Sequence, residues 1–353
     1  MSKGSKNKIW MIYPGNKSTW MTRDEEIFGA LNFEVKSSSF PIYPKYVLPL
    51  SFFKQFFQFL FNQRKFSYIV CQGGGYHSFL PAILNRIFKG KVIVIAVGTD
   101  CVNYPSIDYG NFRKNLYRYF TSKSFLHATI ICPVHQSLIQ YENTFYPVDP
   151  SYQGLKTFIP KLEENKLKVI NYGFDMTKWP YMGKDRLPHS YLTVVGEINE
   201  RTTPLKGIDL LIDYFKSNPE STLTIVGRMN CNLDFPDNIK LIPFVKQDEL
   251  KEIYNEHQYY FQLSISEGLP NTLCEAMLCG CIPIGSSNSS IPEIIGREEN
   301  VLLKKDVEAL KALIQKLPEY NEEDALYFRQ RILTNYPIKK RLEDFKNLFA
   351  THQ

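Results

Sequence analysis

The sequence of 353 residues lacks any run of about 18 consecutive apolar residues, so it predicts no membrane-spanning helix. Its seven cysteines form no CxxC pair, its six histidines form no HExxH motif, and no DxD motif occurs. The basic start of the chain leads into a strand-like segment without the apolar core of a signal peptide. We therefore expect free thiols, no cofactor, no bound metal and a cytoplasmic location.

The chain also has no large excess of charge of either sign. Lysine and arginine number 42 and the acidic residues 36, an imbalance too small to indicate nucleic-acid binding by itself. The length allows about two domains, each with a sizeable core. The unusual feature is the aromatic content of 14%, in an otherwise ordinary globular composition.

Short β-branched segments alternate with helix-like segments along the first half of the chain. This alternation is typical of βαβ units in a parallel sheet. Strands are predicted at residues 9–13, 68–71, 92–97, 129–132 and 167–171. Helices are predicted at 79–88, 109–126 and 136–143. Residues 172–190 then break the alternation with Gly, Pro and Trp, which indicates a linker.

The alternation begins again after the linker. Strands are predicted at 192–195, 223–226, 239–244, 259–263 and 282–284, and helices at 208–215, 248–255, 271–278 and 307–317. We therefore predict an α/β fold with two Rossmann-like, doubly wound parallel-sheet domains, at residues 1–172 and 191–335, joined by a linker at 173–190. Ligands of such sheets bind beyond the carboxyl ends of the strands, so the cleft between the domains is the expected site.

The segment 266–277, Ser-Glu-Gly-Leu-Pro-Asn-Thr-Leu-Cys-Glu-Ala-Met, carries the clearest chemistry. It follows a predicted strand and opens a helix, where Gly268 permits a tight turn and Pro270 suits the first helical turn. Free amides at that helix start can hold a phosphate. Glu267 and Glu275 stand on either side of the turn and could take hydroxyl groups of one ligand. The alternative is a capped helix with two surface glutamates.

This segment resembles the E-x7-E signature of family-4 glycosyltransferases, and residues 267–284, EGLPNTLCEAMLCGCIPI, resemble the fuller family pattern. Further similarities follow in the family order. They are residues 192–196, the Lys206-Gly207-Ile208-Asp209 segment, residues 224–227 and residues 290–295. In the first half, only the alternation and residues 171–175, NYGFD, are similar. The resemblance implies a GT-B fold and retaining transfer from a nucleotide-diphosphate sugar.

The resemblance also implies roles for individual residues. Glu267 would contact the donor sugar, Glu275 the nucleotide ribose, and Lys206 the diphosphate, whose developing charge needs cations when no metal is present. Further donor-binding candidates are Gly268, Leu269, Pro270, Asn271, Gly15, Gly227 and Ser290. The family arginine is replaced here by Glu197, and Arg201 is our candidate substitute. Ser289 and Ser290 stand where the family has two glycines.

The acceptor side is predicted from polar residues that follow first-half strands. Gly15 and Asn16 follow the first strand, and His77 follows the glycine-rich turn after the second. Asp100 follows the strand 92–97, at a place where the family often has a polar residue facing the cleft. We expect Asp100 to be catalytic and Asn16 and His77 to lie near the acceptor. The alternative for Asp100 is a turn or helix cap.

Aromatic residues gather in the segment 51–61, which has phenylalanines at 52, 53, 56, 57, 59 and 61. A second segment, 113–123, combines basic residues with Tyr117, Tyr119 and Phe120. Two such helices could rest on an anionic membrane surface, as a peripheral protein on the inner face of the membrane. The alternative is a phenylalanine stripe in the core and a solvated basic face.

The last segment, 336–353, holds a basic amphipathic helix from 338 to 349. The resemblance implies that it crosses back to the first domain, and its apolar stripe needs a surface to cover. We thus expect a hexosyltransferase-like enzyme of surface polysaccharide or glycoconjugate assembly that acts on a glycan or lipid-linked acceptor and binds no nucleic acid. Alternatives are a non-transferase enzyme of the same fold, such as a sugar-nucleotide epimerase, or a non-enzymatic nucleotide-sugar-binding protein.

Overall fold

Five parallel strands form the centre of the first domain in a computed structural model that describes residues 7–88 and 90–352. The inner strands β3 and β4 are buried along their whole length, as expected for a parallel sheet covered on both faces. The order in the sheet is β2-β1-β3-β4-β5. Their bounds are β1 Lys8–Pro14, β2 Glu34–Phe40, β3 Tyr68–Gln72, β4 Val92–Ala96 and β5 Ile130–Pro133.

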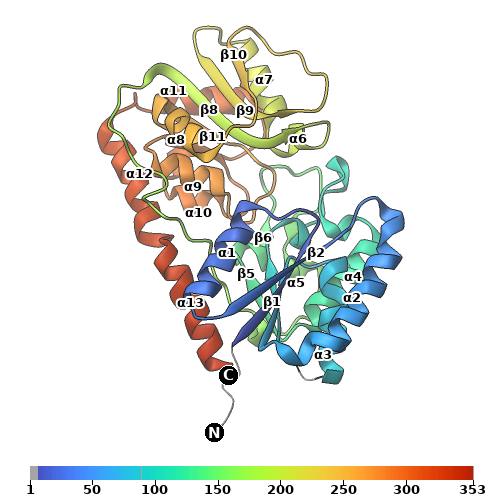
Figure 1. Cartoon of the computed structure of the whole chain (residues 1–353). Helices are drawn as coiled ribbons and strands as arrows, with labels where there is room; N and C mark the ends of the chain where they lie inside the picture. Colours follow the sequence, from blue (N-terminus) through green and yellow to red (C-terminus); the bar gives the residue numbers. More distant parts are fainter. Residues whose placement is uncertain (1–6, 89, 353) are drawn as a thin grey trace.

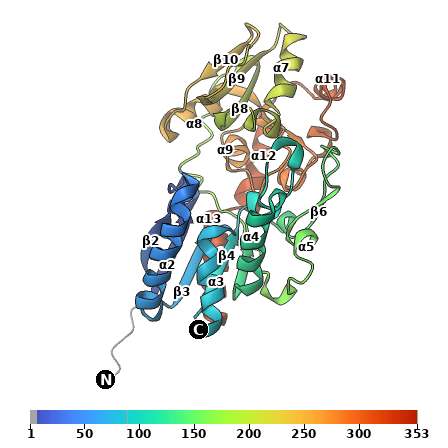
Figure 2. The ribbon, with the colours of Figure 1, turned by 90° about the vertical axis from the view of Figure 1, so that its right-hand side faces the viewer.

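Helices cover both faces of this sheet (Figures 1 and 2). One layer holds α2 (Leu48–Asn62), α3 (Tyr76–Phe88) and α4 (Asn115–His127), and the other holds α1 (Thr19–Ala30) and the last helix of the chain, α13 (Ile338–Thr351). A small hairpin of β6 (Tyr141–Glu142) and β7 (Tyr152–Gln153) and the short helix α5 (Leu155–Phe158) complete the domain.

The second domain, above the first in Figure 1, has six parallel strands in the order β10-β9-β8-β11-β12-β13. Their bounds are β8 Leu187–Ile198, β9 Thr222–Met229, β10 Ile239–Ile242, β11 His257–Gln262, β12 Ile282–Ser286 and β13 Val301–Leu302. Its helices are α6 Thr202–Leu205, α7 Ile208–Lys216, α8 Gln247–Glu256, α9 Asn271–Leu278, α10 Ile291–Ile295, α11 Val307–Lys316 and α12 Glu322–Asn335. The predicted α/β class with two parallel-sheet domains is confirmed.

The chain passes between the domains twice, and the two passages lie side by side. Phe174, in the linker, forms a parallel bridge with Pro337, which separates α12 from α13. From there α13 runs down the first domain, where Phe345 contacts Phe28 of α1 with ring centroids 5.0 Å apart. The hydroxyl of Tyr68 donates to the carbonyl of Phe349 at 3.1 Å, so α13 covers the sheet itself.

Two predicted elements of the first half are wrong, and a third begins later than predicted. Residues 136–143 form a 3-10 turn followed by β6 instead of a helix. The helix predicted from residue 109 begins only at Asn115, because Asp108 and Gly110 have positive φ angles of 47° and 92°. Residues 167–171 run beside β5 but form only an isolated bridge, Ile131 to Leu167. The linker is also shorter than predicted, since β8 begins at Leu187.

No helix among residues 7–88 and 90–352 is long and apolar enough to cross a membrane. All seven cysteines are free, and six of them are buried.

Candidate active site

The turn between β11 and α9 lies where the two domains meet. Gly268 of this turn touches the first domain directly, because a Cβ atom built on it would lie 2.2 Å from the carbonyl oxygen of Val97. Val97 follows β4, so the carboxyl end of a first-domain strand approaches a second-domain turn. Only glycine permits this approach of two backbones. On its first-domain side, the predicted site is therefore bounded by the turn that follows β4.

Lys206 and Glu267 form an ion pair beside this turn. The Nζ atom of Lys206 lies 2.5 Å from Oε1 of Glu267, which also accepts a hydrogen bond from Gln262 Nε2 at 3.0 Å. Burial acts against the charged form of Lys206, but Glu267 and Tyr109 together outweigh it, so the pKa of Lys206 is raised. Both side chains keep part of their surface exposed, so a ligand can reach this pair of opposite charges.

Gly207 fixes the position of Lys206. It has a φ of +71°, and a Cβ atom built on it would lie 2.6 Å from the carbonyl oxygen of Leu263. Lys206 follows α6, and Gly207 precedes α7 against the end of β11. A glycine here therefore lets the backbone turn in the space beside β11, and Lys206 comes to lie beside Glu267.

Glu275 lies about one helical turn into α9 and faces a different part of the interface. It lines a cavity of about 440 Å³ together with Arg23 of α1, Trp179 of the linker and Gln247 of α8. Burial raises the pKa of the Glu275 carboxyl to about 7, and the nearby Arg23 guanidinium opposes this shift. The cavity thus offers a carboxyl group and a cation at the junction of both domains and the linker.

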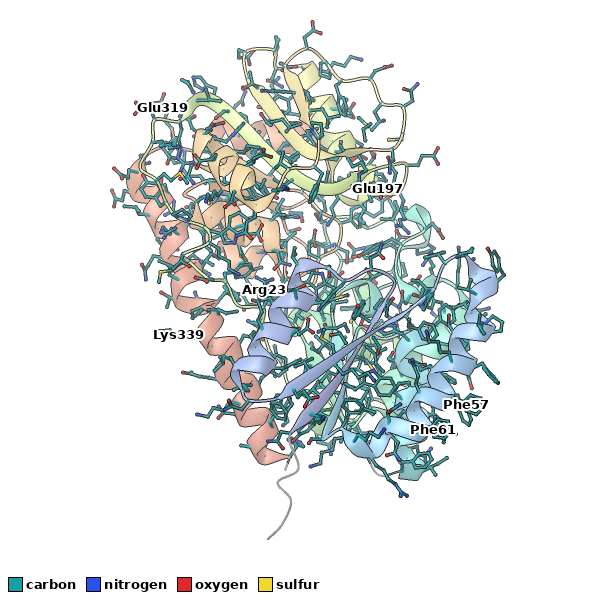
Figure 3. The ribbon with its side chains drawn as sticks, viewed as in Figure 1. Arg23, Phe57, Phe61, Glu197, Glu319 and Lys339 are labelled. Carbon is teal, nitrogen blue, oxygen red and sulfur yellow. The ribbon has the colours of Figure 1, made fainter. Side chains whose placement is uncertain are left out.

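Arg23 is a residue that sequence reasoning missed. Its guanidinium donates from Nη1 to the carbonyl of Gly173 at 3.0 Å and from Nη2 to Oδ1 of Asn271 at 2.6 Å. It therefore joins α1, the linker and α9, and it lies between the domains in Figure 3. Burial lowers the pKa of Arg23, with Glu275 acting in the opposite direction. The sequence gives no signal for it, because an arginine on an amphipathic helix is ordinarily a surface residue.

Arg201 and Glu197 occupy the loop that departs from the family pattern. Arg201 is exposed at the start of α6, and its guanidinium has no hydrogen-bond or ion-pair partner among the described residues. Glu197 accepts hydrogen bonds from Asn230 and Asn199, which lower its pKa, and Arg228 and Arg201 add to this effect. Sequence reasoning missed Arg228, although it follows Gly227 directly and pairs in register with Glu197.

Ser289 and Ser290 form the turn before α10. Ser289 has a φ of +51°, a conformation that glycine adopts most easily, and its Oγ accepts a hydrogen bond from the Glu267 amide at 3.2 Å. The Oγ atom of Ser290 is buried without a partner. The backbone thus has the positive φ of a glycine-rich turn at this place even though serine is present.

Asp100 and His77 have their polar atoms engaged with the backbone. The buried Asp100 carboxylate accepts hydrogen bonds from the amides of Gly74, Val97 and Gly98 at 2.7–3.0 Å, which are the contacts of a turn cap. Burial nevertheless raises its pKa. His77 Nε2 lies 2.9 Å from the Gln72 carbonyl, and burial lowers the pKa of His77 to about 4. Together these contacts hold the turns after β3 and β4.

The turn with Gly15 and Asn16 lies at the end of β1. It lines a second cavity of about 510 Å³, together with Tyr43 and other residues of the segment that leads from β2 to α2. Asn16 is exposed and Gly15 is half-buried. This cavity is separate in its lining from the one at Glu275.

Tyr109, a side chain of the first domain, interacts electrostatically with both members of the Lys206–Glu267 pair. Its hydroxyl lies 2.8 Å from Oγ1 of Thr99, and burial raises its pKa, while Lys206 lowers it. Tyr109 in turn raises the pKa of Lys206. Sequence reasoning placed Tyr109 in a helix, so its role at the site was missed.

A second set of contacts joins the domains at the turn before α10. Asn288 Nδ2 donates to the hydroxyl of Tyr104 at 3.2 Å and to Oδ1 of Asn143 at 3.1 Å. Gln136 Nε2 donates to Oε2 of Glu293 at 2.6 Å. The turn that carries Ser289 and Ser290 is therefore fixed by residues of the first domain.

Residues 193–332 match a family model described as glycosyl transferases group 1. Over 137 residues the chain is 25% identical to the serotype-specific mannosyltransferase WbdA of Escherichia coli, which covers 39% of this chain and 16% of that protein. Over 175 residues it is 27% identical to the amylovoran biosynthesis glycosyltransferase AmsK of Erwinia amylovora, covering 44% of this chain and 42% of AmsK. The chain thus spans less than half the length of these curated relatives.

Among solved structures, sucrose-phosphate synthase from Thermosynechococcus elongatus is similar over nearly the whole chain. The TM-score is 0.75, with 98% of each chain covered and 13% sequence identity, which is a similarity of fold. The site described above lies largely within the matched residues, with Glu267, Glu275 and Lys206 all inside 193–332. Residues 193–332 are accordingly similar to glycosyl transferases group 1, and the chain as a whole has a two-domain GT-B fold.

Proposed function

We propose that this protein is a retaining glycosyltransferase that moves a sugar from a nucleotide-diphosphate sugar to a glycan or lipid-linked acceptor without a metal ion. It would act in the cytoplasm, in the assembly of a surface polysaccharide or glycoconjugate. The observation that carries the proposal is the Lys206–Glu267 pair, 2.5 Å apart at the strand ends where the two domains meet. Mannose transfer by WbdA and the part of AmsK in amylovoran biosynthesis support the assignment to polysaccharide assembly.

The opposite charges of Lys206 and Glu267 suit cleavage of a nucleotide-sugar donor. When the bond between sugar and diphosphate breaks, negative charge develops on the leaving phosphate, and a fixed cation stabilises it. Lys206 supplies such a cation, and its pKa is raised, so it stays protonated at neutral pH. Donor binding would place the phosphate within reach of Lys206 and leave Glu267 for the hydroxyls of the sugar.

Retention is supported by the acceptor side. An inverting reaction needs a general base to deprotonate the attacking hydroxyl. The two candidates there are engaged otherwise, since Asp100 accepts three backbone amides and His77 contacts the Gln72 carbonyl. We infer that the proton of the acceptor leaves to the departing phosphate on the same face of the sugar.

The test begins with thermal shifts against UDP-, GDP-, ADP- and CMP-sugars, followed by transfer assays with the stabilising donor. Lys206→Ala should then cost about 2–4 kcal/mol of transition-state stabilisation, the usual range for loss of one group that stabilises an oxyanion. The matched control is Lys184→Ala, which removes an ion pair of the same length, 2.5 Å, to Glu252 on the surface of the same domain. Full activity of a folded Lys206→Ala protein would contradict the proposal.

Two further measurements test its finer parts. NMR of the fresh product should show the anomeric configuration of the donor, and an inverted product would refute retention. Turnover should be unchanged by EDTA, and loss of turnover that divalent metal restores would refute metal independence. Donor consumption without an acceptor, giving an isomerised nucleotide sugar, would instead identify an epimerase.

A further inference from the structure

Helix α2 exposes a row of aromatic rings on the side that faces away from the protein. Its inner side packs on the domain, where Phe59 is buried and Gln55 Nε2 donates to the His77 carbonyl at 2.6 Å. On the outer side, Phe53, Phe57 and Phe61 recur every fourth residue and are 62%, 39% and 72% exposed. Figure 3 shows Phe57 and Phe61 on the outer edge of the first domain.

These rings contact one another along the helix. The centroids of Phe53 and Phe57 are 4.7 Å apart, and those of Phe57 and Phe61 are 6.3 Å apart. Leu50, one turn earlier, is also exposed, so the row covers most of the helix length. A continuous apolar row on a protein surface indicates a binding surface, because single exposed apolar residues would not line up at helical spacing.

In the part of the sequence that contains this row of phenylalanines, all charged residues are basic. The sequence has no aspartate or glutamate between Glu34 and Asp100, a stretch that carries eight lysines and arginines. The next acidic residue, Asp108, is already paired with Arg113 and Lys114. Across the whole chain, basic residues exceed acidic ones by only six. The positive charge of the protein is therefore concentrated in this part of the first domain.

The basic residues lie on the same layer as the aromatic row. Helices α2, α3 and α4 lie side by side on one face of the sheet (Figure 2). Apart from Asn115, the exposed residues of these helices and of the short segments beside them are basic or apolar, and we call this surface the basic aromatic face. Its exposed basic members are Lys54, Arg64, Lys65, Arg86, Lys114 and Arg118, and its exposed large apolar members are Leu50, Phe53, Phe56, Phe57, Phe61, Ile87, Leu116 and Tyr119.

We propose that the basic aromatic face docks on an anionic lipid bilayer, with the rings of α2 inserted among the headgroups. A second copy of the chain would bring two positively charged faces together, which disfavours self-association through this surface. A bilayer with acidic phospholipid offers both negative charge for the lysines and arginines and an apolar layer for the rings.

Docking in this way places one end of the cleft at the bilayer. The segment from β2 to α2 exposes Tyr43 and Tyr46, and Tyr43 also lines the cavity at Gly15 and Asn16. The basic aromatic face is thus continuous with the acceptor side of the site. Resting on the proposed function, this arrangement favours an acceptor whose lipid stays in the membrane while its sugar enters the cleft.

The test is sedimentation of the full chain with vesicles, without donor or acceptor. Binding to vesicles of phosphatidylcholine and phosphatidylglycerol should exceed binding to phosphatidylcholine alone at least tenfold at low salt, and raised salt should release part of it. The triple variant Phe53→Ser, Phe57→Ser, Phe61→Ser should lose at least tenfold in binding. Its matched control is Leu187→Ser, Leu303→Ser, Leu326→Ser, three exposed residues of the second domain, which should bind as the native chain does.

The outcomes are separable from those of the transfer assay. The triple variant should keep the native thermal unfolding profile and native thermal shift with the donor, which shows that the fold is intact. Equal vesicle binding by the triple variant and the native chain would overturn the proposal. So would native-chain dimers that the triple variant abolishes, with no vesicle binding. Because no transfer is measured, failure of the proposed function would leave the vesicle result unaffected.

Discussion

Arg341 forms a bidentate ion pair with Asp24 inside the first domain. Nε lies 2.8 Å from Oδ1 and Nη2 lies 2.9 Å from Oδ2, with 1% and 0% of the side chains exposed. Arg341 Nη1 also donates to the carbonyls of Ile170 and Asn171, just before the linker. The pair therefore anchors α13 to α1 and to the start of the linker, next to Arg23 and the candidate active site.

The first prediction concerns this pair. Arg341→Met should destabilise the first domain by about 3–5 kcal/mol, because Asp24 would be left as an uncompensated buried charge. Adding Asp24→Leu should restore part of the loss. Denaturant unfolding measures both, with the exposed Lys339→Met as the control on the same helix. We also expect the rate of sugar transfer to fall more than the affinity for the donor, because the domains lose their alignment. An unchanged unfolding midpoint in Arg341→Met would contradict the anchoring role of this pair.

The second prediction separates the two glutamates. Glu275→Gln should weaken binding of the bare nucleotide, because Glu275 lines the cavity between α1, α8 and the linker. Glu267→Gln should mainly reduce kcat, because it changes the partner of Lys206 beside the reacting sugar. Calorimetric titration and steady-state kinetics measure the two effects. Equal loss of nucleotide affinity in both variants would refute the division of roles.

The third prediction is a pH dependence that belongs to Glu275. Its pKa is raised to about 7 by burial, so in the free protein the carboxyl is largely neutral below this pH and ionised above it. A carboxylate accepts hydroxyl hydrogen bonds better than a neutral acid, so nucleotide affinity should rise as the pH increases through about 7. The protonated form stabilises the free protein below the ordinary pKa of glutamate, and this contribution is lost as the pH rises through about 7.

The same titration in Glu275→Gln provides the control. The variant should show a flat affinity between pH 6 and 8 if Glu275 alone is responsible. Arg23→Gln should shift the midpoint upward, because the Arg23 guanidinium opposes the effect of burial. A midpoint that stays in place in both variants would assign the dependence to another group.

The fourth prediction tests the contact between domains. Gly268→Ala would bring a Cβ atom to 2.2 Å from the Val97 carbonyl, so the domains must separate or the turn must move. We expect at least a tenfold loss of kcat, with each domain still folded by circular dichroism. Gly29→Ala is the matched control, because nothing lies within 4 Å of its Cβ position. Native kinetics in Gly268→Ala would show that this approach is not needed for turnover.

The fifth prediction distinguishes two candidate cations. Arg201 and Arg228 both lie near Glu197, and either could supply the second positive charge for the diphosphate. We expect one of Arg201→Ala and Arg228→Ala to raise the donor KM or lower kcat by tenfold or more, while the other resembles the native enzyme. Arg201→Lys or Arg228→Lys should then rescue the affected position in part. Native kinetics in both alanine variants would exclude each as a diphosphate ligand.

Most strands of both sheets could be predicted because they contain short apolar runs, which a parallel sheet covered on both faces requires. The exceptions are two edge strands, β2 with its Lys-Ser-Ser-Ser stretch and β13, which is only two residues long. The predicted helix at 136–143 failed because two residues of that stretch, Tyr141 and Glu142, pair with Tyr152 and Gln153. Such a pairing depends on residues that lie ten and twelve positions further along the chain.

The site could be predicted only within the second domain. A local motif encodes Glu267 and Glu275, and Gly207 marks the turn that brings Lys206 beside Glu267. Arg23 and Tyr109 could not be predicted, because their place at the site depends on how the two domains dock. A single sequence carries no periodicity or spacing that reports such docking.

The paired passages of the chain at Phe174 and Pro337 have a mechanical consequence. The two backbone segments cross between the domains side by side, so they act as a hinge. The domains can bend about one axis, whereas a single linker would also let them twist freely. Separation of the two domains then becomes a motion with one principal coordinate. Along that coordinate the hydrogen bonds of Asn288 with Tyr104 and Asn143 and the contact at Gly268 would break together.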